Sequence, residues 1–244
     1  MDSGNIGFVL LCAAFVFVMT PGLAMFYGGL VRKKNVVNTM MTSIFIIGVG
    51  IVMWVLFGYS LSFAPSGNAF IGDFRWLGLE GVSLTEGYTD GASIPNMVFS
   101  AFQMMFAVIT PALITGAVAG RMKFKSIFVF TIFWSLIVYY PLAHMVWGQG
   151  GLLGADGIGA LDFAGGDVVH ISSGVSALVL CILLGKRHDY EHSIYRIHNI
   201  PTVVLGASLL MFGWFGFNAG SALAADGLAA HAFMTTGVSA AAAM

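Results

Sequence analysis

Long apolar segments alternate with short polar ones along the whole chain. The apolar segments cover residues 6–30, 37–63, 95–119, 126–147, 163–185, 200–224 and 228 onward. Each is near or above the roughly 20 residues that a helix needs to cross a bilayer. The pattern therefore predicts seven transmembrane helices joined by short connections, which is an all-α polytopic membrane bundle.

Composition strengthens this prediction. Of 244 residues, 58% are hydrophobic and 9% are charged, and the mean hydropathy is +0.91. A soluble domain carries about 25% charged residues. Residues 1–244 are therefore expected to form a single transmembrane domain in contact with membrane lipid. The net charge of -1 and the lack of a basic stripe argue against a nucleic-acid partner.

The basic residues are distributed unevenly between the two sides of the predicted bundle. Nine of the ten Lys and Arg residues follow the first, third and fifth segments, at positions 32, 33, 34, 121, 123, 125, 186, 187 and 196, and only Arg75 falls on the other side. Short cytoplasmic loops are enriched in Lys and Arg. The distribution predicts cytoplasmic placement of these three loops and an extracytoplasmic N-terminus.

Segment 163–185 combines small residues with ionisable ones. Its small residues predict close packing against several neighbours, and hence a central position in the bundle. His170 lies about eight residues, or roughly 12 Å of helix rise, after Asp162, which predicts an ionisable group within the hydrocarbon layer. Asp162 is expected to cap the helix N-terminus. Asp167 precedes His170 by three residues, and either pairs with it or lies at the water boundary.

Aromatic residues stand near the outer ends of three other segments. They are Phe102, Phe106, Trp147, Trp214 and Phe217. Such residues are most often packing residues or interfacial anchors. If they converge, they form a cation-attracting site followed by an apolar constriction.

A metal site is a weaker hypothesis. His188, Glu191 and His192 fit the H-x-x-E-H pattern of one class of zinc peptidases. The pattern is short and lies in a polar loop, so a chance match is favoured over a metal site. The sequence contains no G-x-S-x-G, Walker-type or dinucleotide-binding motif. We therefore expect no enzyme activity, no metal and no cofactor.

Four longer motifs resemble one known family, the ammonium transporters of the ammonium transporter/Rhesus family. They are MTPGLAMFYGGLVRKKNVVNTMM (19–41), PLAHMVWGQGGLL (141–153), DFAGGDVVHISSG (162–174) and GWFGFNAGS (213–221). The resemblance runs in order through nearly all of the chain. It implies a homotrimer in the cytoplasmic membrane. Each subunit would have eleven helices, in two inverted five-helix halves plus a last helix, and one pore.

The resemblance also implies roles for individual residues. Phe106, Trp147 and Ser221 correspond to the external ammonium-recruiting site, with Asp162 as the acid that supports the external vestibule. Phe106 and Phe217 correspond to the stacked phenyl gate, with Phe102 close behind. His170 corresponds to the first of two paired pore histidines. Ammonium or ammonia, methylammonium as an analogue, and a PII-type regulatory protein on the cytoplasmic face are the expected partners.

Two features depart from the family pattern. The chain stops within the seventh expected span, before the second pore histidine, so we expect it to be the N-terminal part of a longer chain, with the second half largely absent. Asp167 stands where a small or hydroxyl residue is expected, which makes a proton-relay role for His170 less secure. An ammonium sensor that signals to a C-terminal module is the alternative function.

Overall fold

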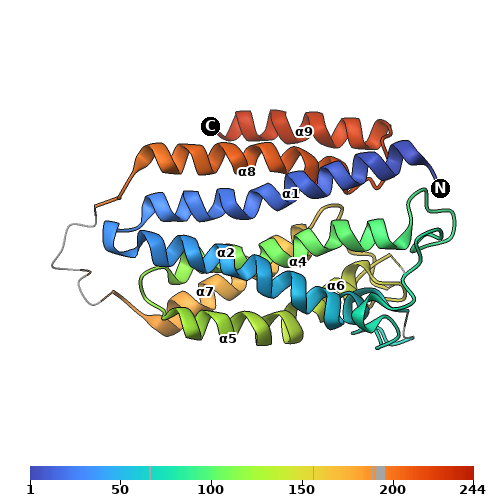
Figure 1. Cartoon of the computed structure of the whole chain (residues 1–244), viewed down its shortest axis with the longest axis horizontal. Coiled ribbons are helices and arrows are strands. Elements are labelled where there is room, and N and C mark those ends of the chain that lie inside the picture. Colours follow the sequence, from blue (N-terminus) through green and yellow to red (C-terminus); the bar gives the residue numbers. More distant parts are fainter. Residues whose placement is uncertain (66, 156, 188–189, 191–195) are drawn as a thin grey trace.

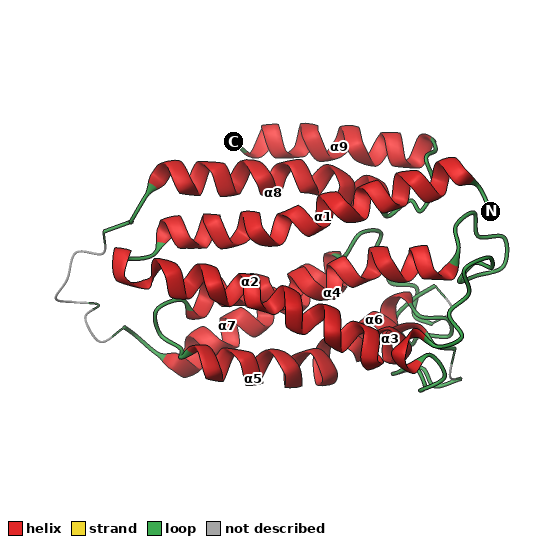
Figure 2. Cartoon of the chain, viewed as in Figure 1, coloured by secondary structure: helices red, strands yellow, loops and turns green. Residues whose placement is uncertain are grey.

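The computed structural model describes residues 1–65, 67–155, 157–187, 190 and 196–244. Within these residues the chain forms helices and turns without any strand (Figure 2). The α-helices are α1 (Ser3–Leu30), α2 (Val36–Met53), α3 (Tyr59–Phe63), α4 (Asn96–Val118), α5 (Phe124–Trp134), α6 (Tyr140–Trp147), α7 (Ser172–Leu184), α8 (Ile200–Gly220) and α9 (Gly227–Ala243). The expected all-α class is confirmed.

Three π-helical turns continue the α-helices. They cover Trp54–Gly58 between α2 and α3, Ser135–Tyr139 between α5 and α6, and Gly166–Ile171 before α7. Each adds residues without ending the helix, so α2 with α3, and α5 with α6, form continuous spans. Short 3-10 turns cover Lys33–Asn35 and Leu77–Leu79.

Six helical stretches are long and apolar enough to cross a membrane. They are Ser3–Leu30, Lys33–Phe63, Asn96–Val118, Phe124–Trp147, Gly166–Leu184 and Ile200–Gly220. These correspond to the first six predicted spans. The seventh predicted span is the helix α9, whose 17 residues rise about 25 Å, less than the roughly 30 Å of a hydrocarbon layer. The structure therefore supports the first six spans, and the seventh stays a prediction.

Helix α4 occupies the centre of the bundle, where it contacts α1, α2 and α7 (Figure 1). Segment 163–185 was predicted to be central, but within the part of the chain that the structure describes it lies at the edge of the bundle. Along α7, Val175, Leu178 and Ile182 are exposed, and a Cβ added at Gly174 would meet no atom within 4 Å. Small residues indicate that close packing is possible, but they do not say which neighbour supplies it.

Close packing through glycine occurs instead between α1 and α8. A Cβ at Gly206 would lie 2.3 Å from the backbone nitrogen of Phe26, and one at Gly29 would lie 2.5 Å from a methyl group of Val203. Contacts this short exclude any side chain. Helices α1 and α8 therefore approach with their backbones in contact, as small residues allow within membranes.

The connections gather at the two ends of the bundle (Figure 1). The N-terminus, segment 64–95 and the connections 148–165 and 221–226 share one end, which we call the outer end. The connections after α1, α4 and α7 share the other end, where Arg32, Lys34, Arg121, Lys186 and Arg187 line one cavity. The loops predicted to be cytoplasmic therefore lie together.

Candidate functional site

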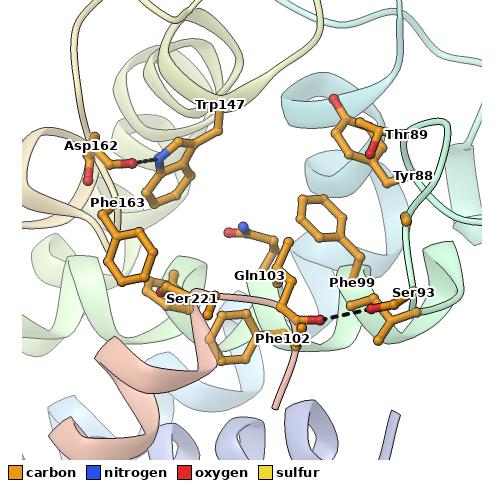
Figure 3. A pocket seen from close by; sticks show the side chains of 16 residues that line it. Tyr88, Thr89, Ser93, Phe99, Phe102, Gln103, Trp147, Asp162, Phe163 and Ser221 are labelled. Carbon is orange, nitrogen blue, oxygen red and sulfur yellow. Dashed lines mark hydrogen bonds between the residues drawn. The ribbon is translucent and has the colours of Figure 1, made fainter. Parts of the chain in front are cut away.

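A cavity of about 400 Å³ opens at the outer end of the bundle (Figure 3). It lies between α4, the end of α6, the residues after α8, and the outer segment 64–95. Five of the predicted site residues line it: Phe102, Phe106, Trp147, Asp162 and Ser221. These residues come from four separate stretches of sequence. The structure thus brings the predicted recruiting residues to one place.

Trp147 and Asp162 are joined directly at the wall of this cavity. The indole Nε1–H of Trp147 donates to the backbone oxygen of Asp162 over 2.9 Å (Figure 3). The ring of Trp147 lies 6.0 Å from that of Phe106, at 82°. The hydroxyl of Ser221 donates to the backbone oxygen of Phe217 over 2.9 Å, so its oxygen can accept a further hydrogen bond.

The carboxylate of Asp162 caps the first turn of the helix that leads into α7. It accepts from the backbone N–H groups of Gly166, Asp167 and Val168 at 2.8, 2.8 and 2.9 Å, and also from that of Gly165. The turn requires glycine at 165, because φ is +102° and a Cβ there would lie 2.7 Å from a methyl group of Val169. The predicted capping role is confirmed. The carboxylate binds all four backbone N–H groups that have no partner within the first turn of the helix.

Gln103 is a cavity residue that the sequence analysis missed. It lines the cavity beside Phe102, and its side-chain oxygen is buried without a hydrogen-bond partner among the described residues. A buried amide oxygen without a partner is costly, so a donor in the cavity would stabilise it. The available signal was a lone amide in an otherwise apolar segment.

Three phenylalanine rings lie behind the cavity. The centroids of Phe106 and Phe217 are 4.3 Å apart at 49°, and those of Phe102 and Phe106 are 4.9 Å apart at 69°. Each side chain is 1% exposed. The three rings therefore form a closed apolar cluster.

The ring of His170 lies against those of Trp214 and Phe217. It stacks on the ring of Trp214, with centroids 5.3 Å apart at 10°, and lies 6.0 Å from that of Phe217. The expected helix rise of about 12 Å from Asp162 to His170 is wrong, because the helix begins at Gly166 and not at Asp162. His170 is therefore four residues into the helix, about 6 Å of rise.

Asp167 and His170 are not joined. Within the described part of the chain, neither a hydrogen bond nor an ion pair links them, and both side chains are partly exposed. Of the two alternatives for Asp167, the position at the head of the helix fits the structure better than pairing. The ring of His170 instead makes its contacts with Trp214 and Phe217.

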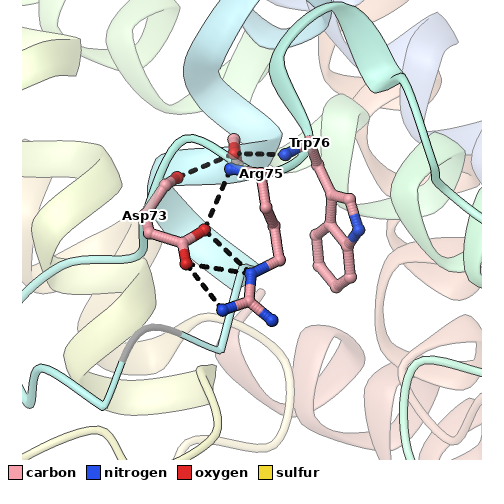
Figure 4. A network of polar contacts seen from close by, with 4 residues as sticks. Asp73, Arg75 and Trp76 are labelled. Atoms are coloured by element: carbon pink, nitrogen blue, oxygen red, sulfur yellow. Dashed lines mark hydrogen bonds and ion pairs between the residues drawn. The ribbon is translucent and has the colours of Figure 1, made fainter.

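The outer segment that forms one cavity wall is tied to α3 (Figure 4). The hydroxyl of Ser60 donates to the backbone oxygen of Asp73 over 2.7 Å and accepts from the backbone N–H of Trp76 over 3.0 Å. Arg75 forms an ion pair with Asp73 at 2.7 Å. Farther along, Tyr88 stacks on Phe99 with centroids 4.6 Å apart and lines the cavity.

The zinc hypothesis gains no support. His188, Glu191 and His192 lie outside the described residues. Among the residues that the structure does describe, no group of three or more His, Cys, Asp or Glu side chains is placed to hold a metal ion.

Comparison with known proteins gives one consistent result. Residues 7–244 match the Ammonium Transporter Family. An ammonium transporter of Bacillus subtilis is 53% identical over 243 residues, which cover 99% of this chain and 58% of that protein. An ammonium transporter of Mycobacterium tuberculosis is 45% identical over 263 residues and is covered over 55% of its length. The chain thus spans little more than half the length of these relatives.

Solved structures give the same match in three dimensions. Saccharomyces cerevisiae Mep2 superposes with a TM-score of 0.86 at 37% identity, over 96% of this chain and 52% of that one. A protein described as a sensor Amt protein superposes with a TM-score of 0.85 at 28% identity, over 98% of this chain and 59% of that one. The relatives with curated names are transporters, which points away from an enzyme.

Proposed function

Because the chain belongs to the ammonium transporter family, we propose that it serves the transport of ammonium or ammonia across a membrane. The observation that supports the proposal is the contact of three groups of residues, which we infer to follow one another along a single path. The outer cavity with Trp147 and Ser221 comes first, then the stacked pair Phe106 and Phe217, then His170. Each group suits one step of moving a small cation that can lose a proton.

Recruitment is the first step. The ring faces of Trp147 and Phe106 attract a cation through their negative quadrupoles. The oxygens of Ser221 and Gln103 accept hydrogen bonds from ammonium, which carries four donors and no acceptor. The carboxylate of Asp162 adds negative charge at the cavity, although its hydrogen bonds are directed to the helix start. Its role is to hold the wall and to assist recruitment.

Passage beyond the cavity requires the loss of water and then of a proton. The buried rings of Phe106 and Phe217 offer no hydrogen-bond partner, so a hydrated ion such as potassium is rejected there. Ammonium can give up a proton and continue as neutral ammonia. His170, whose ring lies against that of Phe217, is the first group on the inferred path that can accept a hydrogen bond or a proton beyond the rings. Transport that carries the proton as well would be electrogenic.

The surroundings of the pore follow from the family and from the charge distribution. We propose a homotrimer in the cytoplasmic membrane, with the N-terminus outside and the basic end of the bundle facing the cytoplasm. The cavity lined by Arg32, Lys34, Arg121, Lys186 and Arg187 is at that end. A PII-type regulatory protein would bind on the same face.

Sensing is a second candidate, favoured by the similarity to the sensor Amt protein. In a sensor the same cavity binds ammonium, but the pore passes little of it and binding changes a cytoplasmic module. The two functions share recruitment at Trp147 and differ in flux. A flux measurement therefore separates them.

The test is uptake of labelled methylammonium, and ammonium-evoked current, by the full-length chain inserted in liposomes. A transporter gives saturable uptake. Trp147→Leu, which removes the ring face and the Nε1–H, should raise KM by about tenfold, whereas Trp147→Phe should raise it less because a ring face remains. Correctly inserted protein that binds methylammonium without flux would favour the sensor, and protein with neither would refute both.

A further inference from the structure

His144 is a fully buried histidine that the path described above does not use. It lies on α6, one turn before Trp147, and its side chain is 0% exposed. Its Nε2 lies 2.8 Å from the backbone oxygen of Asn68, and its Nδ1 lies 3.1 Å from that of Ser62. Both partners belong to the stretch that ends α3 and begins the outer segment.

The chemistry of these two contacts is unequal. Both partners are carbonyl oxygens, which only accept, and a neutral imidazole carries a single N–H. The ring therefore donates to one carbonyl at a time unless it is protonated. The shorter contact, to Asn68, is the one that a neutral ring satisfies best with its proton on Nε2.

Three segments meet at His144. Besides α6 and residues 62–68, the turn after α6 folds back on α6, since the N–H of Leu153 donates to the backbone oxygen of Met145 over 2.8 Å. A Cβ at Gly148 would lie 2.7 Å from Nδ1, and one at Gly151 would lie 2.3 Å from the His144 oxygen. Gly148 is thus required in part by the histidine ring, and Gly151 by the backbone of α6.

The three segments that meet at His144 also hold two walls of the outer cavity. Trp147 is held at the end of α6, immediately before Gly148. In the turn, the side-chain Nε2 of Gln149 donates to the backbone oxygen of Tyr88 over 2.8 Å. The backbone N–H of Gln149 donates to the hydroxyl of Tyr88 over 3.1 Å. The N–H of Leu152 donates to the backbone oxygen of Ala69 over 2.9 Å. A shift of the turn would therefore move both Trp147 and Tyr88.

We propose that His144 is a positioning residue for ammonium recruitment. By donating from Nε2 to Asn68, it docks the outer segment onto α6 and fixes the separation of the cavity walls that carry Trp147 and Tyr88. The proposal rests on the proposed function for its transport readout. His144 has no direct contact with the rings of Phe106 and Phe217 in the described structure. We therefore expect it to act on recruitment and not on passage.

Three substitutions at one position test it. Glutamine places an amide N–H near the position of Nε2 and keeps the bond to Asn68. Asparagine places one near Nδ1 and keeps the bond to Ser62 instead, and leucine keeps neither. His144→Leu and His144→Asn should raise KM for methylammonium by about tenfold with Vmax within about twofold, whereas His144→Gln should stay within about threefold of wild type.

Hydrogen exchange of the Gly148 and Leu152 amides in the same proteins gives a readout that does not need transport. Exchange should be faster in the Leu and Asn variants and near wild type in the Gln variant. The proposal would be overturned if His144→Asn kept the wild-type KM and amide exchange while His144→Gln did not. An unchanged KM in His144→Leu would overturn it as well. If wild type shows no flux, the proposed function fails, and unequal exchange between the Gln and Asn variants still decides the docking role. If the leucine variant does not insert, the comparison of the two amides remains decisive.

Discussion

The ring of Phe106, which lines the outer cavity, packs against that of Phe217 with centroids 4.3 Å apart. One ring comes from α4 and the other from α8, helices that are far apart in the sequence. Gly220 permits this approach, because a Cβ there would lie 2.7 Å from the ring of Phe102, which packs against Phe106. The apolar cluster is therefore a product of tertiary packing around one glycine and three rings.

Removing one ring should weaken the proposed constriction. We expect Phe217→Ala to lower the discrimination between ammonium and potassium, because the widened passage admits water with the ion. The lost packing should also lower the free energy of unfolding by about 3–5 kcal/mol. Potassium flux and ammonium current in liposomes measure the first effect. Phe212→Ala, on the same helix but 50% exposed, is the control. Equal potassium flux in both variants would contradict a gating role.

Asp162 should matter to the fold through its carboxylate. Asp162→Asn replaces one acceptor oxygen with an NH₂ group that faces backbone N–H donors, so we expect a stability loss of about 1–3 kcal/mol. Asp167→Asn removes the same charge from a side chain that accepts no hydrogen bond in the described structure, and is the matched control. Thermal unfolding in detergent compares them. A similar change in Tm for both variants would mean that net charge, and not capping, stabilises this turn.

Much of this site was predictable from sequence, because Trp147, Asp162 and Ser221 lie in long motifs and the family resemblance adds Phe106 to them. Phe106, Trp147, Asp162 and Ser221 were predicted to meet, and they line one cavity. The Asp162 cap followed from an acid placed just before a helical segment. The roles of these residues in transport stay predictions that the experiments above test.

Three features could not be read from the sequence, for separate physical reasons. The helix rise from Asp162 to His170 was overestimated because the capping turn at Asp162 and Gly165 delays the helix start to Gly166. Helix α7 is not central within this chain, because small residues do not identify the neighbour that packs against them. Gln103 was missed because one amide within an apolar run gives no periodic signal, and only its contact with the cavity distinguishes it.

The Asp73 and Arg75 pair predicts a pH effect in the outer segment. Hydrogen bonds from the Arg75 side chain hold the pKa of the Asp73 carboxyl below its ordinary value. A lowered folded-state pKa means that the stabilisation is present above the unfolded pKa of about 3.9 and is lost as pH falls through the lower folded value. The effect is small, because the pair is exposed to water. Stability near neutral pH should therefore not respond to it.

NMR titration of the Asp73 carboxyl carbon measures this directly. Arg75→Gln should return the pKa toward its ordinary value, and Arg75→Lys should give an intermediate value, because lysine keeps the charge without the forked donors. An unchanged pKa in Arg75→Gln would show that the ion pair does not persist in solution.

The ring contacts of His170 with Trp214 and Phe217 make it the group through which proton transfer beyond the phenylalanine rings is tested. His170→Ala should leave insertion intact, because the side chain makes ring contacts without a hydrogen bond in the described structure. We expect its net charge transport to be altered or abolished, since alanine offers no nitrogen to ammonium that has lost its water. Ammonium-evoked current and methylammonium uptake, measured together, separate charge movement from neutral flux. His231→Ala, at an exposed position on α9, controls for the loss of a histidine elsewhere in the chain. Wild-type currents in His170→Ala would assign His170 to packing, and proton transfer would then require another group.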